Sequence, residues 1–343
     1  MKKALLFILA LTLISVLPAC SSASSSGDSE DDTLTIAWYP NESGADLKEA
    51  RDSIGKMIEE ATGKKVEHKT TTDYIIAIES LANGNADLAF MGAQGYIEAN
   101  TKNDKVQPLV VASGESGTLD DAMYHSWLAV KKGNEDAYMD GDEFTIDSIV
   151  DKKFSFVSNS STSGFKVPSA GIVSYFSKQD EFKDLTQEDL LEGGSFFSEV
   201  LYGGSHQGSA VNLLTDKADV AAFCDVCVQN YVELSDGTAN KPGAMYKVME
   251  DAAEPFNTVP GEEFTLISVT PVLNAPFAVN TETVSEDDRK VILDTLTSDE
   301  VANNPEIFVP EDSEKSGLFL KSADERFVKV EDSWFDPIRK LSK

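Results

Sequence analysis

Three polar turns in this sequence have the composition of an anion-binding site. Residues 160–164 carry four hydroxyl side chains and a glycine ahead of a helix-like run. Residues 203–206 end in His206, and residues 39–44 begin with Tyr39. The first amide protons of a helix have no partner within it, and the helix dipole favours negative charge there. The turns therefore predict an oxyanion site that needs no fixed positive charge.

Cys224 and Cys227 are the other residues whose spacing could do chemistry. A thiol-redox site needs such a pair at the first turn after a strand, and residues 219–223 could form that strand. A zinc site would need two further ligands, but the histidines lack ligand spacing: His68, His125 and His206. We therefore predict no metal site. A buried pair of small residues, or a disulfide between them, is the interpretation that we favour.

No catalytic motif accompanies the polar turns. His206 and a serine of residues 161–163 could act as base and nucleophile, but the sequence lacks a Gly-x-Ser-x-Gly elbow, a metal-binding pair and a Walker loop. We therefore expect a binding protein, without a cofactor, and not an enzyme. An extracellular thiol-redox protein that uses Cys224 and Cys227 is the alternative, and it explains fewer features.

The N-terminus predicts export and a lipid anchor. Residues 1–19 combine two lysines with an apolar run, as in a secretory signal peptide. The run ends in Leu-Pro-Ala-Cys, which resembles the lipobox of bacterial lipoproteins, so cleavage would leave Cys20 as a lipidated N-terminus. Residues 20–32 are rich in serine and acidic residues and are expected to form a flexible linker. We expect an extracytoplasmic protein, lipid-anchored to the bacterial cell membrane.

The charge excludes one class of partner. The 343 residues include 29 Lys and Arg against 59 Asp and Glu, a formal charge of -30. Such a polyanion does not bind nucleic acid by neutralising phosphates, and anionic lipid surfaces repel it. The hydroxyl turns must therefore bind any anion by short-range contacts.

Strand-like and helix-like runs alternate along the chain, which predicts an α/β fold. Residues 45–62 place apolar side chains on one helical face and stop at Gly63. Strands are expected at residues 34–38, 65–69, 87–90, 127–130, 154–157, 199–202, 220–223, 264–270 and 276–280. From Ser285 onward we expect mainly helix. Two such α/β units would form two lobes, with the polar turns converging where parallel strands end.

At these turns the sequence resembles the PhnD-like family, the phosphate, phosphite and phosphonate substrate-binding proteins of ABC importers. The resemblance runs from about residue 33 to the C-terminus. Residues 85–96 resemble the family's Asp-hydrophobic-Gly-x-x-x-Tyr segment, and residues 161–164 match its oxyanion-binding turn. Residues 205–206 match its Ser-His pair, and residues 218–225 resemble the following strand and acidic ligand residue.

The resemblance implies a two-lobed type II periplasmic-binding-protein fold. Each lobe would be a mixed sheet flanked by helices, and two crossover strands would join the lobes. We expect residues 33–126 and 275–343 in lobe 1 and residues 127–274 in lobe 2. The lobes would close on the ligand and deliver it to ABC permease and ATPase subunits. We expect the binding protein itself to be a monomer.

The ligand implied by the resemblance is a small phosphorus oxyanion, with phosphonate expected ahead of phosphite and phosphate. A different small organic ligand on the same fold is the alternative. Carried over by position, the ligand-binding residues would be Tyr39, Tyr96, Ser161, Thr162, Ser163, His206 and Asp225. A buried carboxylate such as Asp225 is tolerable only if it accepts a proton-bearing group. Asp225 would therefore select a protonated phosphonate oxygen or an amine on the ligand.

Overall fold

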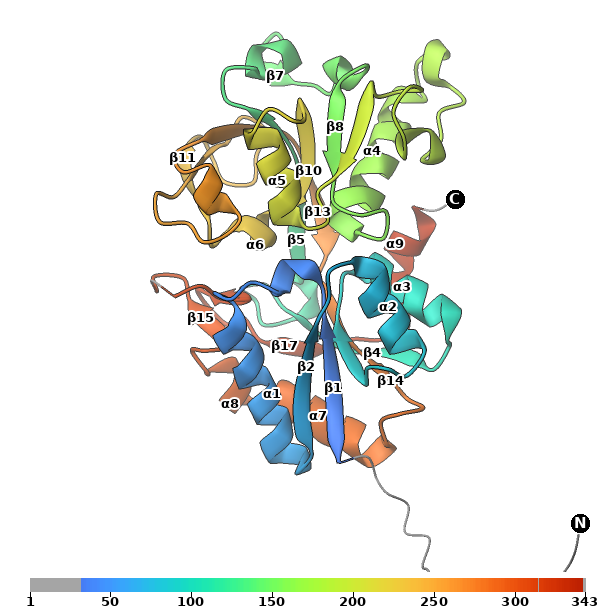
Figure 1. Ribbon diagram of the computed structural model, residues 1–343, viewed down its shortest axis with the longest axis vertical. Helices are drawn as coiled ribbons and strands as arrows, with labels where there is room; N and C mark the ends of the chain where they lie inside the picture. The colour runs from blue at the N-terminus through green and yellow to red at the C-terminus, as the bar shows by residue number, and fades with distance from the viewer. Residues whose placement is uncertain (1–31, 314, 342–343) are drawn as a thin grey trace, which may run out of the picture. The chain divides into compact units, whose positions relative to one another are not determined.

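The structure is a computed structural model that describes residues 32–313 and 315–341. The expected signal peptide and the lipidation site at Cys20 lie outside the described residues. Within residues 33–341, two β-sheets lie one above the other in Figure 1, each flanked by helices. Among the described residues, no helix combines the length and the apolar character that crossing a membrane requires.

The first sheet has six strands, in the order β17-β4-β14-β3-β1-β2. Its strands are β1 (Thr33–Trp38), β2 (Lys65–Thr70), β3 (Leu88–Phe90), β4 (Val106–Ala112), β14 (Pro276–Asn280) and β17 (Phe327–Lys329). β1 pairs in parallel with β2 and β3, whereas β14 is antiparallel to β3 and β4. The helices of this half are α1 (Lys48–Thr62), α2 (Tyr74–Ala82), α3 (Ala93–Lys102), α7 (Glu286–Leu296), α8 (Asp299–Ala302) and α9 (Asp336–Lys340). We call this half lobe 1.

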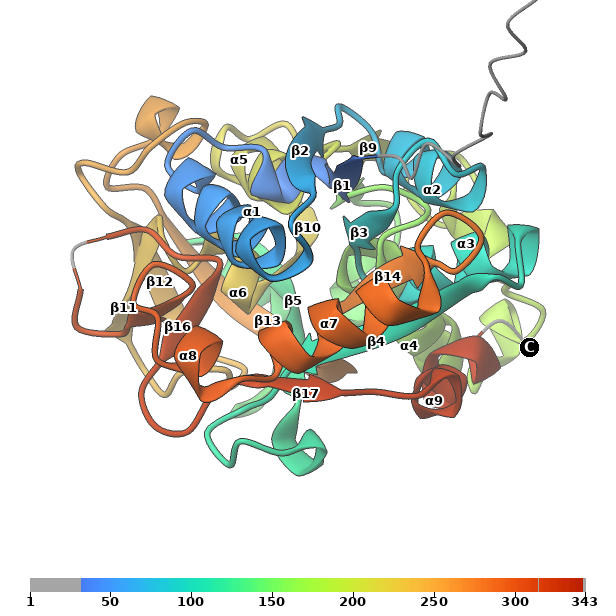
Figure 2. The same ribbon diagram turned by 90° about the horizontal axis from the view of Figure 1, so that it is seen from below.

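Apolar side chains of β1 point alternately to the two faces of the sheet, which explains why helices cover both faces. Ile36 and Trp38 pack in an apolar cluster with side chains of α1 and α7. Ala37 and Tyr39 point to the opposite face, where they pack with α2 and α3. Figure 2 shows the two groups of helices on opposite sides of the sheet. α1 ends as predicted, because Gly63 takes the left-handed conformation, with φ 72°, that closes a helix.

The second sheet has seven strands, in the order β11-β12-β13-β5-β10-β8-β9. Its strands are β5 (Met123–Lys131), β8 (Lys153–Phe156), β9 (Glu199–Tyr202), β10 (Val220–Cys224), β11 (Val232–Asp236), β12 (Met245–Val248) and β13 (Glu263–Leu273). β10, β8 and β9 are parallel, and the other pairings are antiparallel. Its helices are α4 (Val167–Phe176), α5 (His206–Leu214) and α6 (Asp225–Val228). We call this half lobe 2.

The chain passes between the sheets twice. It enters lobe 2 between β4 and β5, and it returns to lobe 1 between β13 and β14. β5 and β13 pair along their length, from Phe264 opposite Lys131 to Leu273 opposite Met123. The two passages therefore lie side by side, as Figure 1 shows between the two halves.

The expectation of a mainly helical C-terminal part is wrong. After α8 the chain forms β15 (Phe308–Pro310), β16 (Phe319–Lys321) and β17, and only the five-residue α9 is α-helical. Phe308, Phe319 and Phe327 pack together in the apolar cluster behind the first sheet. This aromatic packing favours short extended segments over the helix predicted from local sequence.

Lobe 2 also contains a small two-stranded ribbon, in which β6 (Met139–Asp140) pairs with β7 (Glu143–Phe144).

The three polar turns follow the carboxyl ends of strands. The turn after β1 contains a short 3-10 helix at Pro40–Glu42, and the turn after β9 leads into α5. The hydroxyl turn after β8 leads into a π-helical turn at Thr162–Lys166, which continues into α4. π-Helical turns of this kind recur at functional sites.

Candidate functional site

A cavity of about 210 Å³ lies where these turns meet, and we call it the central cavity. Its polar lining comes from both lobes and includes Tyr39, Asn41, Glu42, Tyr74, Tyr124, Ser161, Thr162, Ser163, His206 and Gln207. Its apolar lining includes Leu47, Phe90, Met91, Met123, Val226, Phe308, Leu318 and Phe319. No lysine or arginine is among the residues that line it in the described chain. An anion held there would be bound by neutral donors.

Four buried polar atoms without a hydrogen-bond partner belong to residues that line this cavity. They are Tyr39 Oη, Glu42 Oε2, Ser163 Oγ and Gln207 Oε1. Leaving a buried polar group unpaired costs about 1–3 kcal/mol, so native proteins seldom leave several in one place. Their concentration here indicates that a polar ligand completes these hydrogen bonds.

The hydroxyl turn presents donors at the start of a helix. Ser161 is the N-cap, and its Oγ accepts the N–H of Gly164 at 3.1 Å. The N–H groups of Thr162 and Ser163 occupy the first two helical positions, where a helix offers them no acceptor. All three hydroxyl side chains are buried. The turn can therefore surround an oxyanion with amide and hydroxyl protons.

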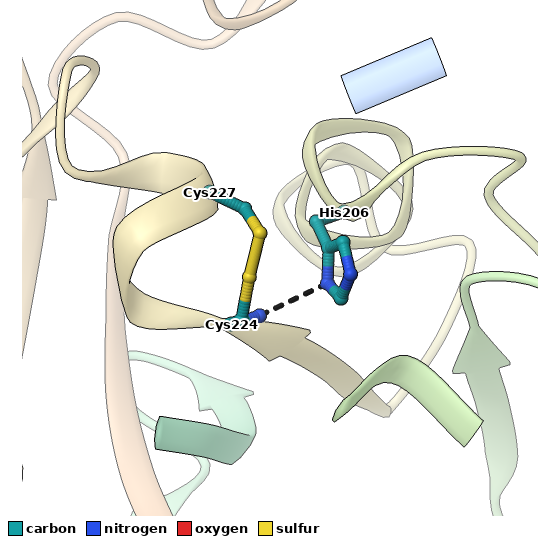
Figure 3. Close-up of side chains that lie close together, drawn as sticks. All are labelled: His206, Cys224 and Cys227. Atoms are coloured by element: carbon teal, nitrogen blue, oxygen red, sulfur yellow. Dashed lines mark hydrogen bonds between the residues drawn. A yellow bond between two sulfur atoms is a disulfide. The ribbon is translucent and has the colours of Figure 1, made fainter. Parts of the chain in front are cut away.

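His206 is held in one neutral form at the edge of the cavity. Its Nδ1 accepts the backbone N–H of Cys224 at 3.0 Å, as the dashed line in Figure 3 shows. Since Nδ1 is the acceptor, the proton resides on Nε2, which lies 3.3 Å from Ser161 Oγ. Burial lowers the pKa of His206 to about 3, so the imidazole is neutral at physiological pH. Its Nε2–H is thus a fixed donor beside the hydroxyl turn.

Tyr39 approaches the cavity from lobe 1. Its side chain is buried and stacks against Tyr74 at 4.0 Å between ring centroids. Burial raises the pKa of the Tyr39 hydroxyl, which therefore remains a neutral donor. A Cβ at Gly95 would lie 1.7 Å from Tyr39 Oη. Glycine at position 95 is consequently required for the tyrosine to occupy this position.

Glu42 places a carboxyl group in the same cavity. The residue is 9% exposed, and loss of hydration raises the pKa of its carboxyl to about 8.

Asn41, the neighbour of Glu42, connects the lobes. Its Oδ1 accepts the backbone N–H of His206 at 3.1 Å, and its backbone carbonyl accepts a hydrogen bond from Gln207 Nε2 at 3.1 Å. Asn41 Nδ2 in turn donates to Tyr74 Oη at 2.7 Å.

Further hydrogen bonds between the lobes show that the cleft is closed. The backbone N–H of Gln94 in α3 donates to Thr162 Oγ1 at 2.9 Å, and Ser160 Oγ donates to Glu98 at 2.8 Å. A Cβ at Gly92 would lie 2.6 Å from Thr162 Oγ1, so glycine permits this approach.

The opposite side of the cleft is bridged in the same way. Asn230 exchanges two hydrogen bonds with the backbone of Gly317, at 3.0 and 3.1 Å. Tyr231 Oη donates to the Asp46 carboxylate at 2.9 Å. Contacts at both sides of the cavity thus restrict access to it in this conformation.

Of the residues expected to bind the ligand, the structure brings five together around the central cavity and places two elsewhere. Tyr39, Ser161, Thr162, Ser163 and His206 line the cavity. Tyr96 and Asp225 are not among its lining residues.

Tyr96 lies within lobe 1. Its hydroxyl donates to Asp332, which also pairs with Arg339, and its ring packs on Phe335. These partners come from the C-terminal segment, and no local sequence pattern indicates that this segment lies beside α3. Tyr96 therefore fastens that segment to lobe 1.

Asp225 is paired inside lobe 2. Its carboxylate accepts the His125 backbone N–H at 2.9 Å and lies 2.7 Å from His125 Nδ1. It also accepts the N–H of Val226 at 2.8 Å. The carboxylate that faces the cavity is Glu42. The motif 218–225 located the correct strand but could not indicate which way the side chain after it would point.

The sequence-based choice of site residues omitted Asn41, Glu42, Tyr74, Tyr124 and Gln207, which also line the cavity. Asn41 and Glu42 lie in one of the three polar turns, so the turn itself was the available signal. From the sequence, Tyr74 is expected to pack in the core. Tyr124 could equally contact the ligand or lie at the surface of a hinge. Tertiary packing brings these tyrosines to the cavity, since Tyr39, Tyr74 and Tyr124 belong to one apolar cluster.

Cys224 and Cys227 form a disulfide that spans the end of β10 and the start of α6 (Figure 3). These two sulfurs lie within 4.8 Å of each other and of a ring nitrogen of His206. Among the described residues, this is the one cluster of three side chains that could hold a metal ion. Because both sulfurs are in the disulfide, neither is available as the thiolate that zinc binds.

Comparison with known proteins places these features in a family. Residues 36–335 match the family model described as "ABC transporter, phosphonate, periplasmic substrate-binding protein". The chain is 30% identical over 238 residues to the phosphate-import protein PhnD of Mycolicibacterium smegmatis, a match that covers 67% of each protein.

Solved structures share the fold. A binding-protein component of an ABC phosphonate transporter from Pseudomonas aeruginosa aligns with a TM-score of 0.63 and 18% identity, over 90% of this chain and 85% of that one. PhnD1 of Prochlorococcus marinus, in complex with methylphosphonate, aligns with a TM-score of 0.63 and 16% identity, over 91% and 97% of the two chains. The expected two-lobed type II periplasmic-binding-protein fold is confirmed.

Proposed function

Because the chain belongs to the family of periplasmic phosphonate-binding proteins of ABC transporters, we propose that its central cavity binds a phosphonate in preference to phosphite and phosphate. Membership makes the chain an extracytoplasmic substrate-binding protein for phosphonate or phosphate import. The alternative of a thiol-redox protein is not favoured, since the family is one of transport proteins.

The observation that carries the proposal is the set of neutral donors around one cavity. Ser161, Thr162 and Ser163 supply hydroxyl groups, and two unpaired amide protons stand at the start of their helix. His206 adds its Nε2–H, and Tyr39 adds an unpartnered hydroxyl from the other lobe. A small tetrahedral oxyanion has acceptors in several directions, which matches donors that arrive from both lobes.

The size and the apolar lining of the cavity support an organic substituent on the ligand. The cavity has a volume of about 210 Å³, which is enough space for several water molecules. Phosphate and methylphosphonate, with five heavy atoms each, leave part of that volume free, so the cavity has room for a larger organic substituent. Met91, Met123 and Phe319 line the same cavity and could contact an alkyl group.

Transport follows from binding, without chemical conversion of the ligand. We propose that the lobes open to admit the oxyanion and close through contacts such as Asn41 with His206. The closed protein would then be recognised by ABC permease and ATPase subunits, as in the family. Lipidation at Cys20 would keep the monomeric binding protein at the membrane. Tyr96 and Asp225 would not contact the ligand but would hold neighbouring segments in position.

Calorimetric titration tests the ligand class. We expect methylphosphonate to bind the wild-type protein more tightly than phosphite or phosphate, and Ser163→Ala to weaken binding by about tenfold because one donor is lost. Ser177→Ala, at the C-terminal end of α4 and away from the cavity, is the matched control and should bind as wild type. Absence of binding to all three oxyanions would overturn the proposed function.

A further inference from the structure

Glu42 gives the central cavity an acidic group where an anion is expected to bind. It is the one aspartate, glutamate, lysine or arginine among the residues that line the cavity in the described chain. Its side chain is nine-tenths buried, and Oε2 has no hydrogen-bond partner. An ionised carboxylate beside an oxyanion, both shielded from water, would repel it strongly. Some group must therefore place a proton between them.

The surroundings of Glu42 offer no charge that removes this conflict. The positive charge of Arg51 in α1 lowers the pKa of Glu42, but burial outweighs it, and the guanidinium donates to the backbone carbonyls of Glu42 and Gly44. The other titratable groups that face Glu42 are Tyr39, Tyr74 of α2, Tyr124 of β5, Tyr231 and His206 of α5. Burial keeps all five neutral at physiological pH, since it raises the pKa of the tyrosines and lowers that of His206.

We propose that Glu42 and the bound oxyanion share a single proton, so that the site is specific for an anion basic enough to hold that proton. This inference rests on the proposed function. A protonated Glu42 that donates to a fully deprotonated phosphonate and an ionised Glu42 that accepts from a monoprotonated phosphonate contain the same number of protons. Either arrangement gives Oε2 the partner that it lacks.

The proton balance predicts how binding depends on pH. In the empty site the pKa of Glu42 is raised to about 8, so at neutral pH the carboxyl brings the shared proton, and a phosphonate that is still monoprotonated in solution releases its own proton on binding. Above pH 8 both Glu42 and methylphosphonate are deprotonated before binding, and one proton must be taken up from solvent. Affinity then falls by up to tenfold for each pH unit, which is the limit for uptake of one proton.

Titration calorimetry of methylphosphonate between pH 7 and pH 9.5 measures this uptake. Two buffers with different ionisation enthalpies are used at each pH, because proton uptake makes the observed enthalpy depend on the buffer. For the wild-type protein we expect uptake to approach one proton at pH 9 and above. Glu42→Gln supplies an amide proton at every pH, so its affinity should be nearly independent of pH and of buffer.

Glu60→Gln is the matched control, because it removes the same charge from an exposed position on α1 and should retain the wild-type slope. The wild-type measurement stands without the variant, should Glu42→Gln fold poorly. Binding without proton uptake, or an unchanged slope in Glu42→Gln, would overturn the shared proton alone. An aminoalkylphosphonate that binds more tightly than methylphosphonate without proton uptake would also overturn it, by assigning Glu42 to an ammonium group. Absence of any phosphonate binding at pH 7 would overturn the proposed function as well.

Discussion

His206 acts as a directional donor because its two ring nitrogens have different partners. The backbone N–H of Cys224 occupies Nδ1, which leaves the proton on Nε2 beside Ser161. Ser161 Oγ already accepts from Gly164, so its own proton is free to be donated elsewhere. A neutral imidazole thus orders the hydrogen-bond directions around the hydroxyl turn without adding positive charge. Lysine in this position would bind anions more generally and would select less by geometry.

Replacement of this imidazole tests its role. We expect His206→Ala to weaken methylphosphonate binding by about 10- to 100-fold, the loss of one strong donor at about 1.5–3 kcal/mol. Because the pKa of His206 is about 3, its charge should contribute no change in wild-type affinity between pH 5 and pH 7. Calorimetry gives the affinity, and thermal unfolding of the variant shows whether it is folded. An affinity equal to that of the wild type would show that Nε2 does not contact the ligand.

At the scale of elements, the site depends on how closely the start of α3 approaches the hydroxyl turn of lobe 2. The Gln94 N–H reaches Thr162 Oγ1 across the lobe boundary at 2.9 Å. Gly92 stands where a side chain would obstruct that contact. The same hydroxyl turn therefore binds the opposite lobe through Thr162 and lines the cavity, so we expect closure and ligand binding to be coupled.

Gly92→Ala is predicted to impair closure. Its Cβ would lie 2.6 Å from Thr162 Oγ1, closer than side chains pack, so the lobes must separate or Thr162 must turn away. We expect affinity for methylphosphonate to fall at least tenfold, with only a small change in the melting temperature of the empty protein. Gly171→Ala is the control, since nothing lies within 4 Å of a Cβ at that position in α4. Calorimetry and small-angle scattering, with and without ligand, measure affinity and closure. Equal closure of the two variants would refute the coupling.

At the scale of the molecule, a formal charge of -30 surrounds a site for anions. Long-range electrostatics therefore oppose the approach of the ligand, whereas the contacts that hold it are short-range and shielded from water. We therefore expect ligand specificity to come from contacts in the closed cavity and not from the electrostatic field of the whole protein. The same charge is unfavourable for binding to nucleic acid.

The association rate should reveal this opposition. We expect the rate constant for methylphosphonate to increase as ionic strength rises from 0.01 to 0.15 M, because the screening length shortens from about 30 Å to about 8 Å. Stopped-flow tryptophan fluorescence measures the rate, and sucrose at matched osmolality controls for effects unrelated to charge. A rate that decreases with salt would indicate a local positive field at the cleft.

The sequence by itself determined the α/β alternation, most strand positions and the hydroxyl turn, because apolar periodicity and helix-start chemistry are local. β9 at Glu199–Tyr202 and β14 at Pro276–Asn280 have the predicted bounds. The aromatic residues after α8 are extended and not helical as predicted, because packing behind the first sheet imposes their extended form.

Only the tertiary structure decided which acid faces the cavity. Asp225 and Glu42 both follow strands that end at the cleft, but the family resemblance indicated Asp225 alone. His125, a hundred residues earlier in the chain, satisfies Asp225. Glu42 is buried where lobe 1 meets α5, and its Oε2 has no hydrogen-bond partner. The direction of a side chain and its distant partners depend on long-range packing, which no local pattern contains.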